Sequence, residues 1–454
     1  MENVAPPFEL TQDYLDKFRE AIDSQNEAYI RESLASVRHE DISALLEEFN
    51  AEQSKYVLKL LEKDVASDVI EDLDEDTRSK FLSVFHPIEI SEYIEEMETD
   101  DAVDILNDLP IKVREEVIAN LGNIEKVNYI IELLRYDEDC AGGLMAKELI
   151  RANVNWNVVQ CVEEIRRQAE NVEKIYAVYV VDDNDKLLGR VSLMEIIIAK
   201  STTKIADIYN SEIISVYTYQ KEEEIAEIMQ KYDLEAVPVI NVQGKLVGRI
   251  TVDDIIDVIT ELADQEIKLM AGIAEDVEED DNVWILSRAR LPWLIIGLFG
   301  GLVGARFIGV FEEDLMKVAS LAFFIPLIIA TGGNVGIQSS ALVVQSLASI
   351  TAFETSAWKK FIKTLLVAIL NGVVLSGLVY AFVFFLYGAT LAFVVSVALF
   401  SVVMLASLLG TAIPLALDKI GFNPALASGP FITTTIDLLG LAVYFIVAHL
   451  LYNF

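Results

Sequence analysis

Five long apolar stretches in the C-terminal part of the chain set the strongest constraint on its fold. Each has at least the ~20 residues that an α-helix needs to cross a hydrocarbon core about 30 Å thick. The stretches cover residues 291–311, 318–344, 364–387, 391–417 and 425–452. The sequence therefore predicts a transmembrane domain of five helices over residues 291–454.

Lysine and arginine residues predict the orientation of this domain, because short loops that carry them stay in the cytoplasm. If the helices alternate, one side holds Arg288, Arg290, Lys359, Lys360, Lys363 and Lys419, and the other side holds Lys317. This pattern predicts a multi-pass protein of the cell inner (plasma) membrane, with a cytoplasmic N-terminal part and the C-terminus outside. The first ten residues, MENVAPPFEL, lack the features of a signal peptide, which agrees with that orientation.

The charge of the chain is concentrated before residue 288, where the composition is that of a soluble protein. The formal net charge is −37, from 35 Lys+Arg against 72 Asp+Glu. A nucleic-acid partner is not expected, because phosphates require a basic surface. Cys140 and Cys161 have neither zinc-site nor disulfide-framework spacing. With three histidines and neither a nucleophile motif nor a phosphate loop, the sequence does not predict an enzyme.

Polar and small residues mark two of the five spans. The second contains PLIIATGGNVGIQSS, where we expect Pro326 and the glycines to interrupt the helix and Asn334 to supply an oxygen. The fifth begins NPALASGPFITTTIDLLG and carries one carboxylate, Asp437. A carboxylate in hydrocarbon costs roughly 2.5–3.5 kcal/mol or more, which favours an ion-pathway role for Asp437. The structural alternative is that the glycines pack helices and Asp437 hydrogen-bonds Asn334 or a threonine.

The chemistry of these groups indicates the type of ion. Oxygen donors without histidine or cysteine suit hard cations such as magnesium, calcium or manganese. Magnesium loses its water reluctantly, so a magnesium pathway would offer hydroxyls and carbonyls to a hydrated ion, with few direct carboxylates. One aspartate per chain is few for such a pathway. A homodimer with the pore on its two-fold axis would present two, and we therefore expect a homodimer.

An internal repeat occupies the second part of the soluble region. KLLGRVSLMEII at residues 186–197 recurs 59 residues later as KLVGRITVDDII. Each copy combines an alternating strand pattern with a following helix, and the pair resembles tandem cystathionine-beta-synthase-type (CBS) domains. The resemblance implies that Thr251 and Asp254 hold the ribose and phosphates of an adenine nucleotide such as ATP. The first copy has Ser192 and Glu195 in these places. A dimerising module that binds no nucleotide is the alternative.

The first 138 residues show a helical pattern with a period of 36 residues. Asp64, Ala66, Asp68, Asp72 and Leu73 recur as Asp100, Ala102, Asp104, Asp108 and Leu109. Such a period predicts an acidic superhelical stack of helices. Each aspartate ladder places like charges one turn apart, which costs roughly 0.2–0.5 kcal/mol per pair unless a cation neutralises them. A bound divalent cation and a solvated acidic face are the two interpretations.

The region between the second repeat and the first span is predicted to contain a connecting helix. Asp253, Asp257 and Glu261 share one face of the helix that leads into this region. A second acidic cluster comprises Glu275, Asp276 and residues 278–281. The predicted boundaries are 1–138 for the N domain, 139–200 and 201–264 for the CBS domains, 265–290 for the connecting helix, and 291–454 for the transmembrane domain.

Taken together, the chain resembles the MgtE family of magnesium channels and transporters over essentially its whole length. The domain order matches, and the most specific motifs are PLIIATGGNVGIQ at 326–338 and NPALASGPFITTTID at 423–437. The predicted fold class is thus multidomain: an all-α acidic superhelical N domain, an α/β tandem CBS pair, a connecting helix and a five-helix α transmembrane domain.

The resemblance implies a homodimeric channel for magnesium influx in a lipid bilayer, with Asp437 at the centre of the pore and Asn334 and Thr433 nearby. It also implies that cytosolic magnesium binds the N domain, the CBS domains and the connecting helix and closes the pore. The positions that match this regulatory sensor are Asp100, Asp104, Asp254, Asp257 and Glu266.

Two positions depart from the family pattern. Asn423 stands where an aspartate is common at one end of the pore, and Gln265 stands where an acid is often found in the sensor. The sequence leaves other functions open: a pore of broader divalent selectivity, an ion-coupled secondary transporter, or a membrane-anchored nucleotide sensor. Broken, polar helices in two spans favour transport over a simple anchor.

Overall fold

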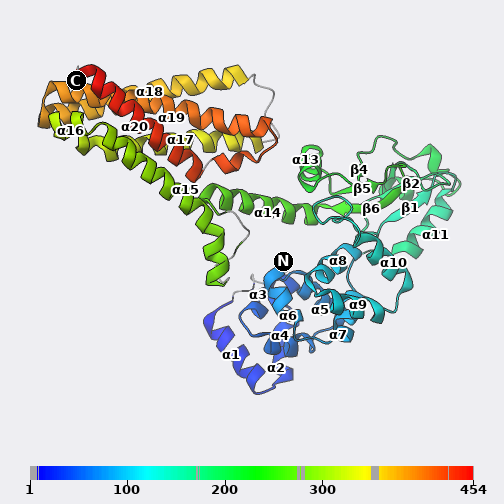
Figure 1. The fold of residues 1–454 in the computed structure, drawn as a ribbon. Helices are drawn as coiled ribbons and strands as arrows, with labels where there is room; N and C mark the ends of the chain where they lie inside the picture. The colour runs from blue at the N-terminus through cyan, green and yellow to red at the C-terminus, as the bar shows by residue number, and fades with distance from the viewer. Residues whose placement is uncertain are drawn as a thin grey trace, which may run out of the picture. The chain divides into compact units, whose positions relative to one another are not determined.

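The structure is a computed structural model that describes residues 8, 10–169, 172, 174–273, 277, 282–348, 357–427 and 429–452. The chain forms two compact units, Met1–Val258 and Ile259–Phe454 (Figure 1). The acidic cluster predicted at Glu275, Asp276 and 278–281 lies outside the described residues.

The N domain is a stack of short helices in which alternate helices pack together. The contacting pairs include α3 with α5, α5 with α7, α7 with α9, α4 with α6, α6 with α8, and α8 with α10. This is the superhelical arrangement that the repeat predicts. The helices are α1 (Gln12–Asp23), α2 (Glu27–Leu34), α3 (His39–Glu47), α4 (Ala51–Leu58), α5 (Lys63–Glu71), α6 (Glu75–Leu82), α7 (Pro87–Ile94), α8 (Thr99–Asp108), α9 (Ile111–Asn120) and α10 (Ile124–Leu133).

Equivalent positions of the 36-residue repeat have equivalent places in this stack. Ala66 of α5 and Ala102 of α8 are both fully buried, because a small side chain lets neighbouring helices approach. Several helices start at capping residues, such as Asn50, whose Oδ1 accepts from the Gln53 N–H at 3.0 Å. The apolar face of each short helix therefore joins one continuous core.

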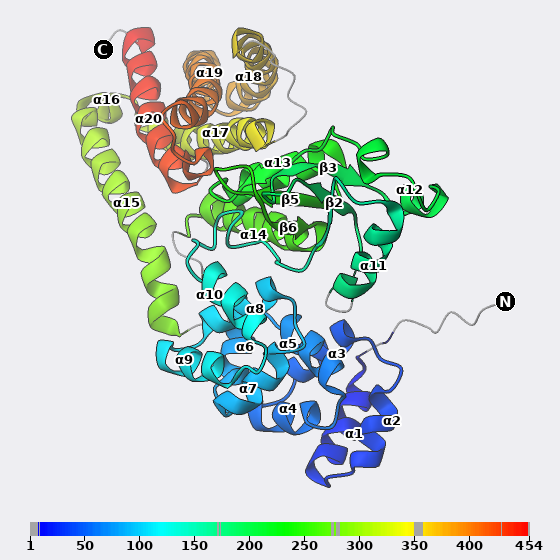
Figure 2. The same ribbon diagram turned by 90° about the vertical axis from the view of Figure 1, so that its right-hand side faces the viewer.

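Each CBS repeat forms a three-stranded sheet with a parallel pair and an antiparallel hairpin. In the first, β1 runs parallel to β2, which pairs antiparallel with β3. In the second, β4, β5 and β6 repeat this order. Figure 2 shows both sheets with the helices around them. The elements are β1 (Ile150–Asn153), α11 (Val158–Gln168), β2 (Val178–Val181), β3 (Leu187–Val191), α12 (Leu193–Ile198), η2 (Ile205–Asp207), β4 (Val216–Tyr217), α13 (Glu222–Tyr232), β5 (Ala236–Ile240) and β6 (Leu246–Thr251).

The two repeats exchange their leading segments. The chain before β1 pairs with the second sheet, through bridges of Cys140 with Lys221 and of Ala146 with Arg249. The chain before β4 pairs with the first repeat, where Asn210 bridges Arg190. The sequence predicts CBS domains at 139–200 and 201–264. Backbone pairing in the structure crosses the boundary between these two ranges in both directions.

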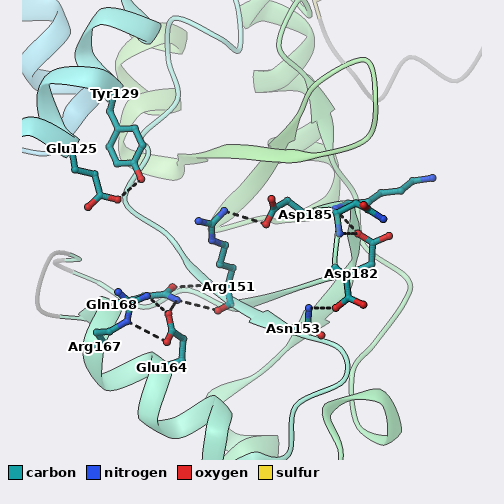
Figure 3. A network of polar contacts seen from close by, with 12 residues as sticks. Glu125, Tyr129, Arg151, Asn153, Glu164, Arg167, Gln168, Asp182 and Asp185 are labelled. Carbon is teal, nitrogen blue, oxygen red and sulfur yellow. Dashed lines mark hydrogen bonds and ion pairs between the residues drawn. The ribbon is translucent and has the colours of Figure 1, made fainter.

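Polar contacts hold the rim of the first sheet, as Figure 3 shows. Arg151 of β1 lies 3.6 Å from the Asp185 carboxylate, and Asn153 donates to Asp183 at 2.9 Å. Asp182 accepts the backbone N–H groups of Asn184 and Lys186, which shapes the turn between β2 and β3. These carboxylates are satisfied by protein donors, and we assign them a structural role.

A long helix, α14 (Val252–Ala271), leaves β6 and continues into the second unit. It ends at Gly272, which has a φ of +80°, and the Ile273 N–H bonds back to the Lys268 carbonyl at 2.9 Å. This geometry closes a helix with a left-handed residue, for which glycine has the smallest steric cost. The connecting helix is therefore an extension of the helix that follows the second CBS sheet.

Within the described residues, five helices are long and apolar enough to cross a membrane. They are α15 (Val283–Val310), α17 (Ile325–Ala348), α18 (Ala357–Tyr387), α19 (Ala389–Lys419) and α20 (Pro430–Tyr452), which Figure 1 shows together. Shorter helices precede two of them: α16 (Glu312–Lys317) and η3 (Ala319–Phe324) before α17, and η4 (Pro424–Ala427) before α20. The predicted fold class is confirmed.

The expected interruption of the second span at its glycines is wrong. α17 continues through them, and the irregular segment lies ahead of Ile325, where Pro326 stands in the first turn and needs no hydrogen-bonded N–H. The glycines instead allow close packing. A Cβ built on Gly336 would lie 1.9 Å from Ile436 Cδ1, and one on Gly410 would lie 2.5 Å from the Gly336 carbonyl oxygen.

Candidate metal-ion sites

Four aspartates from two domains converge in the soluble unit. Asp100, Asp101 and Asp104 lie in α8 of the N domain, and Asp254 lies in the first turn of α14. Asp100 is buried, with 7% of its surface exposed, whereas the side chain of Asp104 is exposed. The negative charge of Asp254 acts on all three aspartates of α8. The structure therefore brings together three of the residues predicted for the sensor, Asp100, Asp104 and Asp254.

The crowding of these carboxyl groups raises their pKa values. Loss of hydration is the largest cause for Asp100 and Asp101, whose pKa values lie well above the ordinary range, and neighbouring carboxylates add to the shift. Loss of hydration also raises the pKa of Asp104 to about 7, although Arg78 opposes the shift. The pKa of Asp254 is raised for the same reason. The cluster is thus destabilised when all its members are charged, and a cation would relieve it.

The donor set fits magnesium. This ion takes oxygen ligands, accepts one or two carboxylates directly and keeps several waters. The exposed Asp104 leaves room for water on one side, while Asp100 and Asp254 supply oxygens from two domains. Asp254 uses Oδ2 to accept from Thr251, so within the described residues its Oδ1 has no hydrogen-bond donor.

A second acidic group beside this cluster was not predicted from the sequence. Glu98, Asp100 and Glu148 each place one oxygen within 4.8 Å of the others. Arg249 already binds both oxygens of Glu98, at 2.7 and 2.6 Å, and Thr99 Oγ1 donates to Glu148 Oε2 at 2.6 Å. Protein donors therefore already engage two of its three carboxylates, and Asp100 belongs to both this group and the aspartate cluster.

The remaining sensor candidates lie along α14. Asp257 is exposed, and its pKa is raised by loss of hydration and by the charges of Asp253 and Asp72. Asp257 therefore lies within electrostatic range of the N-domain residue Asp72, whose Oδ2 is 2.7 Å from His39 Nδ1. Glu266 is half-buried and lies further along the helix, in the second unit. The two aspartate ladders differ, because Asp64 in the first is exposed while Asp100 in the second is buried.

The candidate nucleotide residues have a local structural role in both repeats. Asp254 Oδ2 accepts from the Thr251 N–H and Oγ1 at 2.9 and 2.7 Å. Ser192 and Glu195 of the first repeat form the same kind of pair, a capping box at the start of α12. Each pair stabilises the beginning of a helix. The sequence motif thus has a structural explanation that does not require a nucleotide.

In the membrane domain, Asp437 lies against Gly333 of α17. A Cβ built on Gly333 would be 3.7 Å from Asp437 Oδ1 and 4.0 Å from Thr433 Cγ2. Asn334, the next residue of α17, is exposed. Within the described residues, the carboxylate of Asp437 has no hydrogen bond or ion pair. The structural alternative, a hydrogen bond to Asn334 or a threonine, is therefore not observed there.

Asn423 and Thr433 use their side chains in local contacts. Asn423 Oδ1 accepts from the Ala425 N–H at 2.8 Å and starts η4, while Thr433 Oγ1 donates to the Pro430 carbonyl at 3.0 Å. The structure places Thr433 one turn before Asp437 on the same face of α20. Arg306 is exposed on α15 and forms no ion pair within the described residues, so it does not compensate Asp437 there.

Family models match three parts of the chain. They are the MgtE intracellular N domain at residues 37–139, the CBS domain at 141–201 and 205–261, and a divalent cation transporter family, MgtE, at 325–447. A magnesium transporter MgtE of Thermus thermophilus is 34% identical over 438 residues, which is 95% of this chain and 97% of that protein. The chain belongs to the MgtE family. The resemblance predicted from the sequence is confirmed.

Other relatives agree with this assignment. A magnesium transporter MgtE of Enterococcus faecalis is 38% identical over 329 residues, 72% of each chain. The crystal structure of the cytosolic domain of the Mg2+ channel MgtE in complex with ATP is 33% identical, with a TM-score of 0.51, and covers 54% of this chain and 99% of that one. The soluble part of a magnesium transporter is 30% identical with a TM-score of 0.50, covering 56% and 99%. The chain itself is a membrane protein of this family.

Proposed function

We propose that this MgtE-family chain carries Mg2+ into the cell through a pore and that cytosolic Mg2+ closes the pore by binding the soluble unit. The observation that carries the proposal is Asp437, an intramembrane carboxylate without a protein cation beside it in the described residues. Such a group is costly in hydrocarbon and is explained by a hydrated cation that passes it. The magnesium transporters among its relatives support Mg2+ as the substrate.

Asp437 would attract the ion through its charge, while Asn334 and Thr433 would offer neutral oxygens to its water shell. Magnesium keeps its hydration, so one carboxylate per chain serves better than a closed ring of ligands. A homodimer would place two copies of Asp437 around one axis. Asn423 supplies an amide oxygen at the start of η4 and attracts a cation less strongly than an aspartate would.

Closure would use the aspartate cluster of the soluble unit. Without Mg2+, repulsion between α8 and Asp254 would weaken the packing of the N domain on the second CBS repeat. Binding of Mg2+ to Asp100, Asp104 and Asp254, and to the acidic groups at Asp257 and Glu266, would favour the packed state. α14 runs from this cluster into the second unit, and a Cβ on Gly272, the residue that follows the helix, would lie 2.7 Å from Pro430 Cγ.

The experiment that tests the pore is Mg2+ entry into liposomes that contain the purified full chain and a trapped magnesium dye. Asp437→Ala should abolish entry and leave a folded protein. Asp418→Ala is the matched control, because Asp418 is an exposed carboxylate at the end of α19. Normal entry through the Asp437 variant would exclude the proposed pore. Entry that requires a second ion would instead support a coupled transporter, and equal entry of Ca2+ or Mn2+ would support broader selectivity.

Two further measurements test the assembly. Light scattering of the detergent-solubilised protein should give the mass of a dimer, and a C-terminal tag should be accessible from the outside of intact cells.

The regulatory proposal is tested by the combined variant Asp100→Asn, Asp104→Asn and Asp257→Asn. Because the variant lacks both the carboxylate ligands and their repulsion, its Mg2+ entry should no longer depend on internal Mg2+, whereas entry through the unmodified chain should fall as internal Mg2+ rises. Entry that still falls with rising internal Mg2+ in this variant would exclude these residues as the sensor.

An adenine nucleotide is proposed as a second ligand, supported by the ATP complex of a relative. Thr251 and Asp254 would hold its ribose and phosphates. Thr251→Val should weaken ATP binding in a calorimetric titration, whereas Ser192→Ala in the first repeat should not. Unchanged ATP affinity in the Thr251 variant would leave Thr251 with only its capping role.

A further inference from the structure

One arginine side chain contacts three parts of the soluble unit. Arg249 lies in β6, and only 4% of its surface is exposed. Its Nη2 donates to both carboxylate oxygens of Glu98, and its Nη1 donates to the Lys174 carbonyl at 3.0 Å. The guanidinium also lies over the ring of Tyr176, 5.2 Å from its centroid. Arg249 thus joins the second CBS sheet to the N domain and to the segment that leads into β2.

Glu98 is the residue directly before α8, so its position determines that of the whole helix. The next residue, Thr99, is also fixed, because its N–H and Oγ1 donate to Glu148 Oε2 at 3.2 and 2.6 Å. The Lys147 N–H donates to Thr99 Oγ1 at 2.9 Å. The first turn of α8 is therefore held from two sides. Asp100 and Asp104 follow in the same rigid helix.

The buried ion pair supplies a permanent positive charge beside the aspartate cluster. A guanidinium keeps its charge at every physiological pH. Removing one partner of a buried pair leaves an uncompensated charge and is strongly destabilising. The charges of Glu98 and Asp100 both act on Arg249. Part of the negative charge at the first turn of α8 is thus neutralised by the protein itself.

The first CBS repeat shows that this contact is specific to one copy. Arg190 occupies the same place in the sequence GRVS as Arg249 does in GRIT. The side chain of Arg190 is exposed, and within the described residues it forms no hydrogen bond or ion pair. The CBS fold therefore does not require a buried arginine at this position. Its burial in the second copy serves the contact with the N domain.

We propose that Arg249 is a positioning residue for magnesium sensing: it fixes the start of α8 against the second CBS sheet so that Asp100 and Asp104 meet Asp254. Bound Mg2+ then neutralises the aspartate cluster, while Arg249 neutralises Glu98. This inference rests on the proposed closure by Mg2+. It adds an arginine and a glutamate that contact neither the substrate nor the regulatory ion.

The test uses a double variant, Glu98→Gln with Arg249→Gln, which leaves the net charge of the region unchanged. Its readout is the Mg2+ concentration that half-protects the N domain of the full chain, in lipid nanodiscs, from chymotrypsin. Coupling between linked binding events is typically about 5- to 150-fold. We expect the half-protecting concentration to rise about tenfold. Because net charge is retained, this shift reports position rather than the electrostatic attraction of Mg2+.

Three further variants complete the test. Glu98→Asp keeps the charge but shortens the side chain, and it should raise the half-protecting concentration in the same direction even if the double variant unfolds. Arg249→Lys keeps the charge but cannot contact Glu98, the Lys174 carbonyl and the Tyr176 ring together, so it should raise the half-protecting concentration by less than the double variant does. Arg190→Gln should match the unmodified chain. A merely structural role would lower thermal stability without moving the half-protecting concentration.

The outcomes separate this inference from the proposed function. If the unmodified chain shows no protection by Mg2+, closure through the soluble unit is excluded and the role of Arg249 with it. If Mg2+ protects the unmodified chain but Glu98→Asp and the double variant respond at the same concentration, the positioning role is overturned while the sensor stands. An equal shift in Arg190→Gln would also overturn it.

Discussion

Replacing Asp104 with asparagine should strengthen the packing of the N domain on the second CBS repeat when Mg2+ is absent. The same change should weaken the effect of added Mg2+ on this packing. The pKa of Asp104 is raised from its ordinary value of 3.8 to about 7. One pKa unit corresponds to about 1.4 kcal/mol, so the full shift would represent about 4 kcal/mol of unfavourable interaction for the charged form. Because the Asp104 side chain is exposed, solvent screening reduces this figure to about 1 kcal/mol.

This energy corresponds to roughly a fivefold increase in the ratio of packed to open molecules at pH 8 without Mg2+. The sign follows from the raised pKa, because the packed state binds the proton more tightly than the open state. The destabilisation is present in full above about pH 7 and is lost as the pH falls toward 3.8. Lowering the pH should therefore favour the packed state of the unmodified chain, as Mg2+ does. The same change of pH should have a smaller effect on Asp104→Asn.

Chymotrypsin protection of the N domain in nanodiscs, measured with a chelator at pH 8 and pH 6, provides the assay. Asp64→Asn is the control, since Asp64 is an exposed acid of the other ladder. Because asparagine removes a charged ligand, the Asp104 variant should also need more Mg2+ for full protection. A variant that is less protected than the unmodified chain without Mg2+ would refute the argument from repulsion.

Three other substitutions have outcomes set by local geometry. Gly336→Ala should destabilise the membrane domain by about 1–3 kcal/mol, because its Cβ would overlap Ile436, whereas Gly301→Ala has no atom within 4 Å and should be neutral in thermal unfolding. Gly272→Ala should destabilise the helix end by roughly 1–2 kcal/mol, because Gly272 has a φ of +80°. It should disturb closure of the pore more than conduction, and measuring Mg2+ flux at low and at high internal Mg2+ would separate the two effects. Lys126→Met should lower the unfolding temperature of the N domain, since Lys126 Nζ donates to the carbonyls of Glu95 and Met97 and the methionine would leave them unpaired.

Patterns that arise from a repeated physical requirement could be read directly from the sequence. The five spans are one case, because the thickness of the hydrocarbon core sets the length of a helix. The N-domain stack is another, because Ala66 and Ala102 recur where helices approach closely. The glycines of the second span do not interrupt the helix as expected; the alternative, that they pack helices, holds at Gly336.

The residues of the candidate magnesium sensor could be predicted only in part. The ladders drew attention to Asp100 and Asp104, yet sequence alone did not show that Asp100 is buried while Asp104 is exposed. Glu98 and Arg249 were missed because they are 151 residues apart and neither belongs to a pattern that predicts a contact between them. The one available signal was the repeat itself, in which an arginine follows the glycine of both copies.

The exchange of leading segments between the CBS repeats has a mechanical consequence. The segment that follows the N domain pairs first with the second CBS repeat, although the first repeat comes next in the sequence. In this segment, Ala146 forms two backbone hydrogen bonds with Arg249, of 2.8 and 2.9 Å. The helix α14 begins at Val252, three residues after Arg249. We expect a displacement of the N domain to reach the start of α14 through these two hydrogen bonds, without passing through the sheet of the first repeat.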